Sequence, residues 1–180
     1  IGGLAPGKGD AISDVAQKLA MGETAPGKIE ADGQQGDPQG LPGEGALRRY
    51  DAYVRRWHDA RQEWAGRVAA DQGAVVFLGD SITQGWAANL NQLFPGIKTI
   101  NRGISGDTTR GVLLRLQTDV IALKPRGIVL LIGTNDLEEA AAPESTASNL
   151  KLILAALKAH NPAMPVVLCN VFPSSATKKR

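Results

Sequence analysis

Residues 75–86 read Val-Val-Phe-Leu-Gly-Asp-Ser-Ile-Thr-Gln-Gly-Trp, four apolar residues followed by a polar turn. Two of the four are β-branched, which favours a strand that is buried in a sheet. Gly79 ends this strand, and Asp80 and Ser81 follow it directly. Ser81 is therefore expected just beyond the carboxyl end of a strand, where open α/β sheets place their sites. By itself, Gly79-Asp80-Ser81 is more often an ordinary turn than a site.

Predicted helices and strands alternate along the rest of the chain. This alternation predicts βαβ units, a parallel sheet, and right-handed crossovers that place helices on both of its faces. The predicted fold class is therefore α/β. Asp107 is expected to cap the helix that begins at residue 108. Helices are predicted at residues 46–73, 87–94, 108–123 and 143–160, and the later strands at residues 97–100, 128–132 and 166–172.

The first 45 residues differ in composition from the rest of the chain. They hold 11 of the 21 glycines and 4 of the 10 prolines, and they contain no aromatic residue. A segment of this composition buries too little apolar surface to fold by itself. We therefore predict that residues 1–45 are a low-complexity linker or disordered segment, and that residues 46–180 form one α/β domain.

The overall composition argues against several classes of partner. The formal net charge is only +2, which gives no indication of binding to nucleic acid or to an anionic membrane. Apolar runs such as residues 128–132 are too short to span a bilayer. The full nucleotide-binding patterns Gly-x-x-x-x-Gly-Lys-Ser/Thr and Gly-x-Gly-x-x-Gly are absent, and we expect no cofactor. Cys169 lies in an apolar run and is expected to be a buried core thiol.

Three of the predicted strands end in loops that carry groups suited to acyl transfer. Ser81 supplies a hydroxyl nucleophile at the start of a helix. Gly106, in the loop 101–107, supplies a backbone N–H with no side chain to block a close approach. Asn135, in the loop 133–137, supplies a side-chain amide donor. Because the strands are expected to be parallel, these loops gather at one edge, where the donors would stabilise a tetrahedral oxyanion.

The three loops resemble three sequence blocks of the GDSL/SGNH hydrolases, in the branch of platelet-activating-factor acetylhydrolase. Residues 79–81 are similar to the first block, residues 101–106 to the second and residues 133–136 to the third. The resemblance implies a flavodoxin-like three-layer α/β/α fold and a serine esterase that acts on a small-molecule ester. It also implies that Ser81 is the nucleophile and that Asp80 supports it. The oxyanion hole would be formed by Ser81, Gly106 and Asn135.

One part of the family pattern does not occur in the 180 residues. The family takes its general base from an Asp-x-x-His near the C-terminus, but Arg55 precedes His58 by three residues and Leu157 precedes His160 by three. We expect His58 on a solvated helix face, and His160 in a last helical turn, where a cation suits the helix dipole. We therefore expect a C-terminally truncated hydrolase whose catalytic histidine lies beyond the given chain, in preference to a natural pseudoenzyme.

Truncation would leave an apolar strand edge unpaired. In the flavodoxin-like strand order 2-1-3-4-5, the missing strand would pair beside residues 166–172. Such an edge is a template for association. We therefore expect the chain to be poorly soluble or to dimerise through this edge, and to catalyse almost nothing without its base.

Two other functions are compatible with the same loops. Asp80, Asp107 and Asp136 at one sheet edge would suit Mg²⁺, as in a phosphoryl-transfer or receiver-type protein. Alternatively, Ser81, Thr83 and a helix N-terminus would cradle a phosphate in a binding module, as in a flavin-binding protein. The metal alternative leaves the glycine and asparagine of the loops unexplained, and we therefore favour the esterase.

Overall fold

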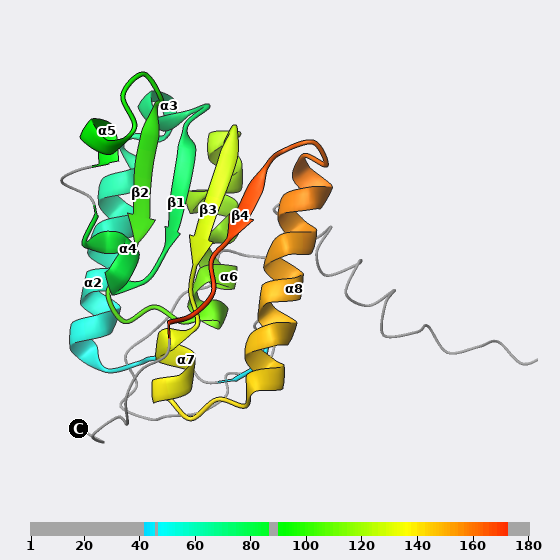
Figure 1. The fold of residues 1–180 in the computed structure, drawn as a ribbon. Helices are drawn as coiled ribbons and strands as arrows, with labels where there is room; N and C mark the ends of the chain where they lie inside the picture. Colours follow the sequence, from blue (N-terminus) through cyan, green and yellow to red (C-terminus); the bar gives the residue numbers. More distant parts are fainter. Residues whose placement is uncertain (1–41, 46, 87–89, 173–180) are drawn as a thin grey trace, which may run out of the picture.

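A parallel sheet of four strands forms the centre of the fold in a computed structural model, which describes residues 42–45, 47–86 and 90–172 (Figure 1). The strand order is β2-β1-β3-β4, and all three strand pairs are parallel. The predicted α/β class and parallel sheet are confirmed, and the order is the flavodoxin-like one for these four strands. The strands are β1 (Val75–Gly79), β2 (Thr99–Gly103), β3 (Gly127–Leu131) and β4 (Val166–Leu168).

The helices follow the predicted order, with several boundaries changed. The N-terminal helix predicted at 46–73 is divided, because Gly66 ends its first part. A short helix that was not predicted follows the third strand. Within the described ranges, no helix is long and apolar enough to cross a membrane. The helices are α2 (Asp51–Ala65), α3 (Val68–Asp71), α4 (Ser81–Gln84), α5 (Leu90–Leu93), α6 (Thr109–Asp119), the 3₁₀ turn η1 (Ile121–Leu123), α7 (Thr134–Glu138) and α8 (Pro143–His160).

Helices lie on both faces of the sheet, as predicted. Successive side chains of a strand point to opposite faces. Val76 of β1 belongs to the main hydrophobic core, which α6 and α8 complete behind the sheet (Figure 1). Phe77 points to the other face, where the centroid of its ring lies 6.2 Å from that of Trp86 and 5.4 Å from that of Phe94. Trp86 and Phe94 follow α4 and α5, so these two short helices belong to the second face.

The N-cap of α6 is Thr108, and the prediction of Asp107 is wrong. The hydroxyl oxygen of Thr108 accepts a hydrogen bond from the N–H of Gly111 at 3.1 Å. The Asp107 carboxylate is bound instead by the Tyr53 hydroxyl at 2.7 Å and by Nε of Arg115 at 2.8 Å. The buried guanidinium of Arg115 binds the Asp107 carboxylate more strongly than a backbone N–H would, and the Thr108 hydroxyl caps the helix instead.

Strand β4 is shorter than predicted and lies at an edge of the described sheet. It ends at Leu168, and Val167 and Leu168 are 56% and 47% exposed. Cys169 follows the strand and is half-buried, so the prediction of a buried core thiol is wrong. Association through this edge stays a prediction. The proposed division of the chain at residue 45 also stays a prediction, because residues 1–41 and 46 lie outside the described part.

Two glycines allow α4 to approach the ends of β1 and β2. A Cβ atom on Gly79 would collide with the Leu131 carbonyl oxygen and the Thr83 side chain. A Cβ atom on Gly103 would collide with the backbone nitrogen of Gln84 and would lie 2.8 Å from the Asp80 carbonyl oxygen. The residues around Ser81 therefore pack directly on strand backbone, which determines the position of the serine.

Because α4 approaches Gly103 so closely, we expect one methyl group added at this position to destabilise the fold. Gly103→Ala is expected to lower the free energy of unfolding by about 2 kcal/mol, since overpacking against backbone costs about 1–3 kcal/mol. Gly66→Ala is the matched control: its φ is −71° and the nearest atom would lie 3.6 Å from the new Cβ. The control should change stability by less than about 0.5 kcal/mol. Urea unfolding measures both, and equal stabilities would contradict the prediction.

Candidate active site

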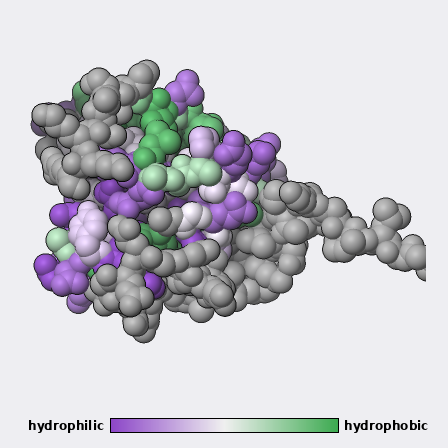
Figure 2. Space-filling model, turned by 90° about the horizontal axis from the view of Figure 1, so that it is seen from below, coloured by the Kyte–Doolittle hydropathy of each residue, from purple (hydrophilic) through white to green (hydrophobic). Residues whose placement is uncertain are grey.

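The carboxyl ends of β1, β2 and β3 lie at one edge of the sheet and continue into the three polar loops. Figure 2 views the molecule from this side, where hydrophilic residues surround the centre and a hydrophobic group lies next to them. Ser81 is the first residue of α4 and is exposed. The fold therefore brings Ser81, Gly106 and Asn135 to the same edge, as the sequence predicts.

Asp80 is the N-cap of α4 and is almost fully buried, with 1% of its surface exposed. Its carboxylate accepts a hydrogen bond from the N–H of Ile82 at 2.9 Å. Burial, reinforced by the Asp107 and Asp136 carboxylates, raises the pKa of Asp80 above its usual range. Asp80 thus holds the turn that presents the Ser81 hydroxyl to solvent.

Gly106 occupies a turn that favours glycine, because its φ is +91°. A Cβ atom here would lie 3.1 Å from the Tyr53 ring, 3.2 Å from Nη1 of Arg48 and 3.4 Å from the Tyr50 hydroxyl. Among the described residues, no acceptor binds the N–H of Gly106, whereas the next N–H, that of Asp107, donates to the turn itself. The Gly106 N–H is therefore free to donate to a ligand.

Asn135 lies in the first turn of α7 and is 6% exposed. Its Nδ2 donates to the Asp107 carbonyl oxygen at 2.7 Å, and it lies 3.4 Å from Oδ2 of Asp80. The first contact is a normal hydrogen bond, while the second is longer than the usual 2.7–3.2 Å. One amide hydrogen thus ties the third loop to the second, and the other lies near the turn that carries Ser81.

The carboxylates of Asp80, Asp107 and Asp136 are each occupied by protein donors. Asp107 binds Tyr53 and Arg115, and Asp136 accepts hydrogen bonds from both the N–H and the hydroxyl of Thr109. Burial raises the pKa of Asp107 and that of Asp136. In the part of the chain that the structure describes, no group of three or more His, Cys, Asp or Glu residues could hold a metal ion. The arrangement thus gives the Mg²⁺ alternative no support.

The phosphate-binding alternative depended on Thr83, which the structure places inside the protein. Thr83 is 4% exposed and its side chain packs against Gly79. Its hydroxyl is therefore not presented at the surface beside Ser81.

Two supporting side chains were not recognised from the sequence. Asn101 donates from Nδ2 to the Thr83 carbonyl oxygen at 2.6 Å, and its Oδ1 accepts from the N–H of Gly103 at 2.8 Å. Gln84 accepts at Oε1 from the N–H of Ser105 at 2.8 Å. Both contacts join α4 to the second loop. An asparagine in a turn and a glutamine in a helix are too common to indicate such contacts.

Arg115 is a further buried residue that sequence reasoning missed. It is 0% exposed, pairs with Asp107, and donates from Nη2 to the Arg102 carbonyl oxygen at 2.9 Å and the Gly79 carbonyl oxygen at 3.3 Å. These carbonyl oxygens belong to the last residue of β1 and the next-to-last residue of β2, so one guanidinium joins both strand ends to the Asp107 loop. Position 115 lies among apolar helix residues, and nothing local distinguishes it from a solvated arginine.

Both histidines of the chain lie in the described part, at the helix positions that the sequence predicts. His160 ends α8, at the edge opposite to the three loops (Figure 1), as the sequence predicts. His58 is exposed on α2, as predicted, and its ring contacts that of Trp57 edge-on at 5.3 Å.

Comparison with protein families matches residues 77–180 to the family described as "GDSL-like Lipase/Acylhydrolase family". Platelet-activating factor acetylhydrolase IB subunit alpha2 of Rattus norvegicus is 30% identical over 121 residues, which are 66% of this chain and 52% of that protein. Subunit alpha1 of Bos taurus is 28% identical over 121 residues, 66% of this chain and 51% of that protein. The chain thus spans about half the length of the curated relatives it matches.

Solved structures show the same likeness. A GDSL-like lipase from Bacteroides thetaiotaomicron is 34% identical with a TM-score of 0.53, and the match covers 60% of this chain and 56% of the other. A Streptococcus pneumonia protein is 22% identical with a TM-score of 0.62, covering 68% and 58% of the two chains, and at this identity the likeness concerns the fold alone.

Proposed function

The chain belongs to the GDSL-like lipase/acylhydrolase family, and we propose from this that the protein is a serine hydrolase that cleaves a carboxylic ester through an acyl-serine intermediate. The observation that carries the proposal is the meeting of three loops at one sheet edge. This edge carries an exposed serine at the start of α4, a glycine N–H without an acceptor among the described residues, and a buried asparagine amide. Because the curated relatives are named acetylhydrolases, a small ester with a short acyl group is the proposed substrate.

In the proposed reaction, Oγ of Ser81 attacks the ester carbonyl carbon and its proton passes to a histidine. The carbonyl oxygen becomes an oxyanion that accepts hydrogen bonds from the N–H groups of Ser81 and Gly106 and from Nδ2 of Asn135. The alcohol leaves with the proton from the histidine. Water then attacks the acyl-serine while the histidine takes its proton, and the acid leaves as the proton returns to Oγ of Ser81. Neither histidine of this chain is assigned as the base, and we propose that the full-length gene product supplies it.

Two experiments test this function. The full-length gene product should hydrolyse p-nitrophenyl acetate, and a fluorophosphonate probe should label it covalently at a serine, because such probes trap activated serine nucleophiles. Labelling without ester turnover would indicate another acyl donor. A protein that shows neither reaction would contradict the proposal.

Replacing Asn135 should lower the catalytic rate and leave substrate binding nearly unchanged. Asn135→Ala in the full-length gene product should lower kcat by about 10²–10³ with little change in KM, because the donor acts mainly in the transition state. Asn135→Asp should be at least as damaging, since it places a second carboxylate near Oδ2 of Asp80 and beside the developing negative charge. Steady-state kinetics with p-nitrophenyl acetate measure both variants.

The matched control is Asn161→Ala. Asn161 caps the C-terminus of α8 at the opposite edge and should leave kcat unchanged. An Asn135→Asp variant as active as the parent would show that this side chain does not face the oxyanion.

A further inference from the structure

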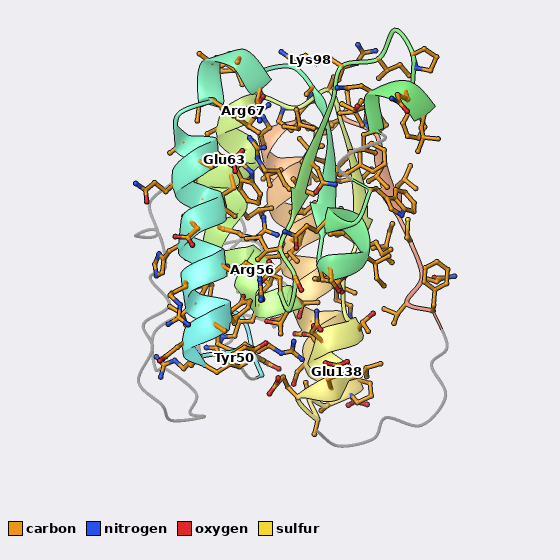
Figure 3. All side chains as sticks on the ribbon, turned by 90° about the vertical axis from the view of Figure 1, so that its left-hand side faces the viewer. Tyr50, Arg56, Glu63, Arg67, Lys98 and Glu138 are labelled. Carbon is orange, nitrogen blue, oxygen red and sulfur yellow. The ribbon has the colours of Figure 1, made fainter. Side chains whose placement is uncertain are left out.

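Arg48 lies before α2, outside the residues that match the family, yet it reaches the candidate active site. It is 9% exposed, which is unusual for an arginine outside an ion pair. Its partners are on α7, the helix that carries Asn135. Figure 3 shows Tyr50 at the start of α2 and Glu138 at the end of α7 on the same side of the molecule, while Arg67 lies at the far end.

The guanidinium of Arg48 binds two carboxylates that follow each other in the chain. Nη2 lies 2.6 Å from Oε2 of Glu138, and Nε lies 2.6 Å from Oε1 of Glu139. Glu138 ends α7, and the N–H of Glu139 donates to the Asn135 carbonyl oxygen at 3.0 Å. Arg48 therefore binds the C-terminal end of α7. The N-terminal end of the same short helix carries Asn135.

The same guanidinium also lies beside the turn of Gly106. Its Nη1 is 3.2 Å from the position that a Cβ atom on Gly106 would take. Gly106 supplies one proposed oxyanion donor and Asn135 another, and the two loops are joined directly by the bond from Asn135 to the Asp107 carbonyl oxygen. Arg48 adds a second link between them, from the opposite end of α7.

The charges around Arg48 argue against a role in binding an anionic substrate. Two glutamates surround one arginine, so the group carries a net charge of about −1 when all three are ionised. Burial lowers the pKa of Arg48, but hydrogen bonds to both glutamates outweigh it and raise the pKa overall. The arginine therefore stays charged and occupied by protein carboxylates.

We infer that Arg48 is a positioning residue of the hydrolytic site, which holds α7 against the Gly106 turn so that the Asn135 amide and the Gly106 N–H converge on one oxyanion. This inference rests on the proposed function. Misplacement of a catalytic group by about 1 Å can cost about 10²-fold in rate. A buried link this close to two donors should therefore affect kcat strongly and KM little.

Kinetics of the full-length gene product test the inference. Arg48→Met should lower kcat for p-nitrophenyl acetate about 10- to 100-fold with KM changed less than about threefold. Arg48→Lys should recover part of the loss, because it keeps the charge but cannot bond two carboxylates with a rigid fork. In an Asn135→Ala background, Arg48→Met should cost clearly less than in the parent, because one of the two donors that Arg48 aligns is already absent. Arg67→Met, which removes an ion-paired but 55% exposed arginine, should leave kcat unchanged.

Hydrogen exchange supplies a readout that does not depend on activity. Arg48→Met should accelerate exchange of the Asp107 and Glu139 amides about tenfold or more, with the amides of β1 unchanged. A rise in KM with kcat unchanged, or a full rate loss that persists in the Asn135→Ala background, would overturn the inference. Unchanged exchange at both amides would also overturn it. A parent protein without ester hydrolysis would count against the proposed function, and exchange alone would then decide whether Arg48 joins the two loops.

Discussion

Ser81→Ala in the full-length gene product is expected to abolish hydrolysis of short-chain esters and covalent labelling by a fluorophosphonate. The expected loss in kcat is on the order of 10⁶, the magnitude found in subtilisin when the nucleophile is removed. Removing the hydroxyl leaves the oxyanion donors in place, but no acyl-enzyme can form. Because Ser81 is exposed and its neighbours pack on strand backbone, alanine should leave the fold unchanged.

Ser105→Ala is the matched control for this prediction. Ser105 lies in the neighbouring loop, where its backbone N–H donates to Gln84 and its carbonyl oxygen accepts from Arg56 at 3.1 Å. The variant keeps both backbone groups and should remain active and labelled. Retained turnover in Ser81→Ala, or labelling lost in Ser105→Ala instead, would discard the assignment of the nucleophile.

The largest effect on stability is expected from Arg115→Met. Asp107 and Arg115 are both 0% exposed, and their side chains meet at 2.8 Å. Removing one partner leaves a buried charge uncompensated, which typically costs about 3–5 kcal/mol of unfolding free energy. The carbonyl oxygens of Gly79 and Arg102 also lose a donor. A domain is commonly stable by only about 5–15 kcal/mol, so this variant should lose a large part of its stability.

Two further variants separate the ion pair from a general loss of arginine. Arg67→Met removes an arginine that is 55% exposed and should cost less than about 1 kcal/mol. Asp107→Asn combined with Arg115→Met should be more stable than Arg115→Met alone, because it removes the unpaired charge. Urea unfolding compares all of them. An Arg115→Met variant within about 1 kcal/mol of the parent would show that the buried pair contributes little.

The arrangement of the sheet could be predicted because its signals are local. A short apolar run followed by a glycine and a polar loop occurs at residues 75–85 and 128–136, and each such pattern is complete within about ten residues. The alternation with helical patterns then determines that the strands are parallel. Parallel strands end at one edge, so the sequence alone placed Ser81, Gly106 and Asn135 together.

The contacts that support this edge depend on residues that are distant in the sequence. Asp107 looked like a helix cap because the sequence shows its neighbours and not Arg115, with which it forms a buried ion pair. Arg48 meets Glu139 across 91 positions, and Asn149 binds both the N–H and the carbonyl oxygen of Glu44 across 105. Packing determines which polar groups are buried and which donors lie close enough to bind them. A buried group without a partner is costly, so the tertiary structure selects these pairs and the local pattern does not reveal them.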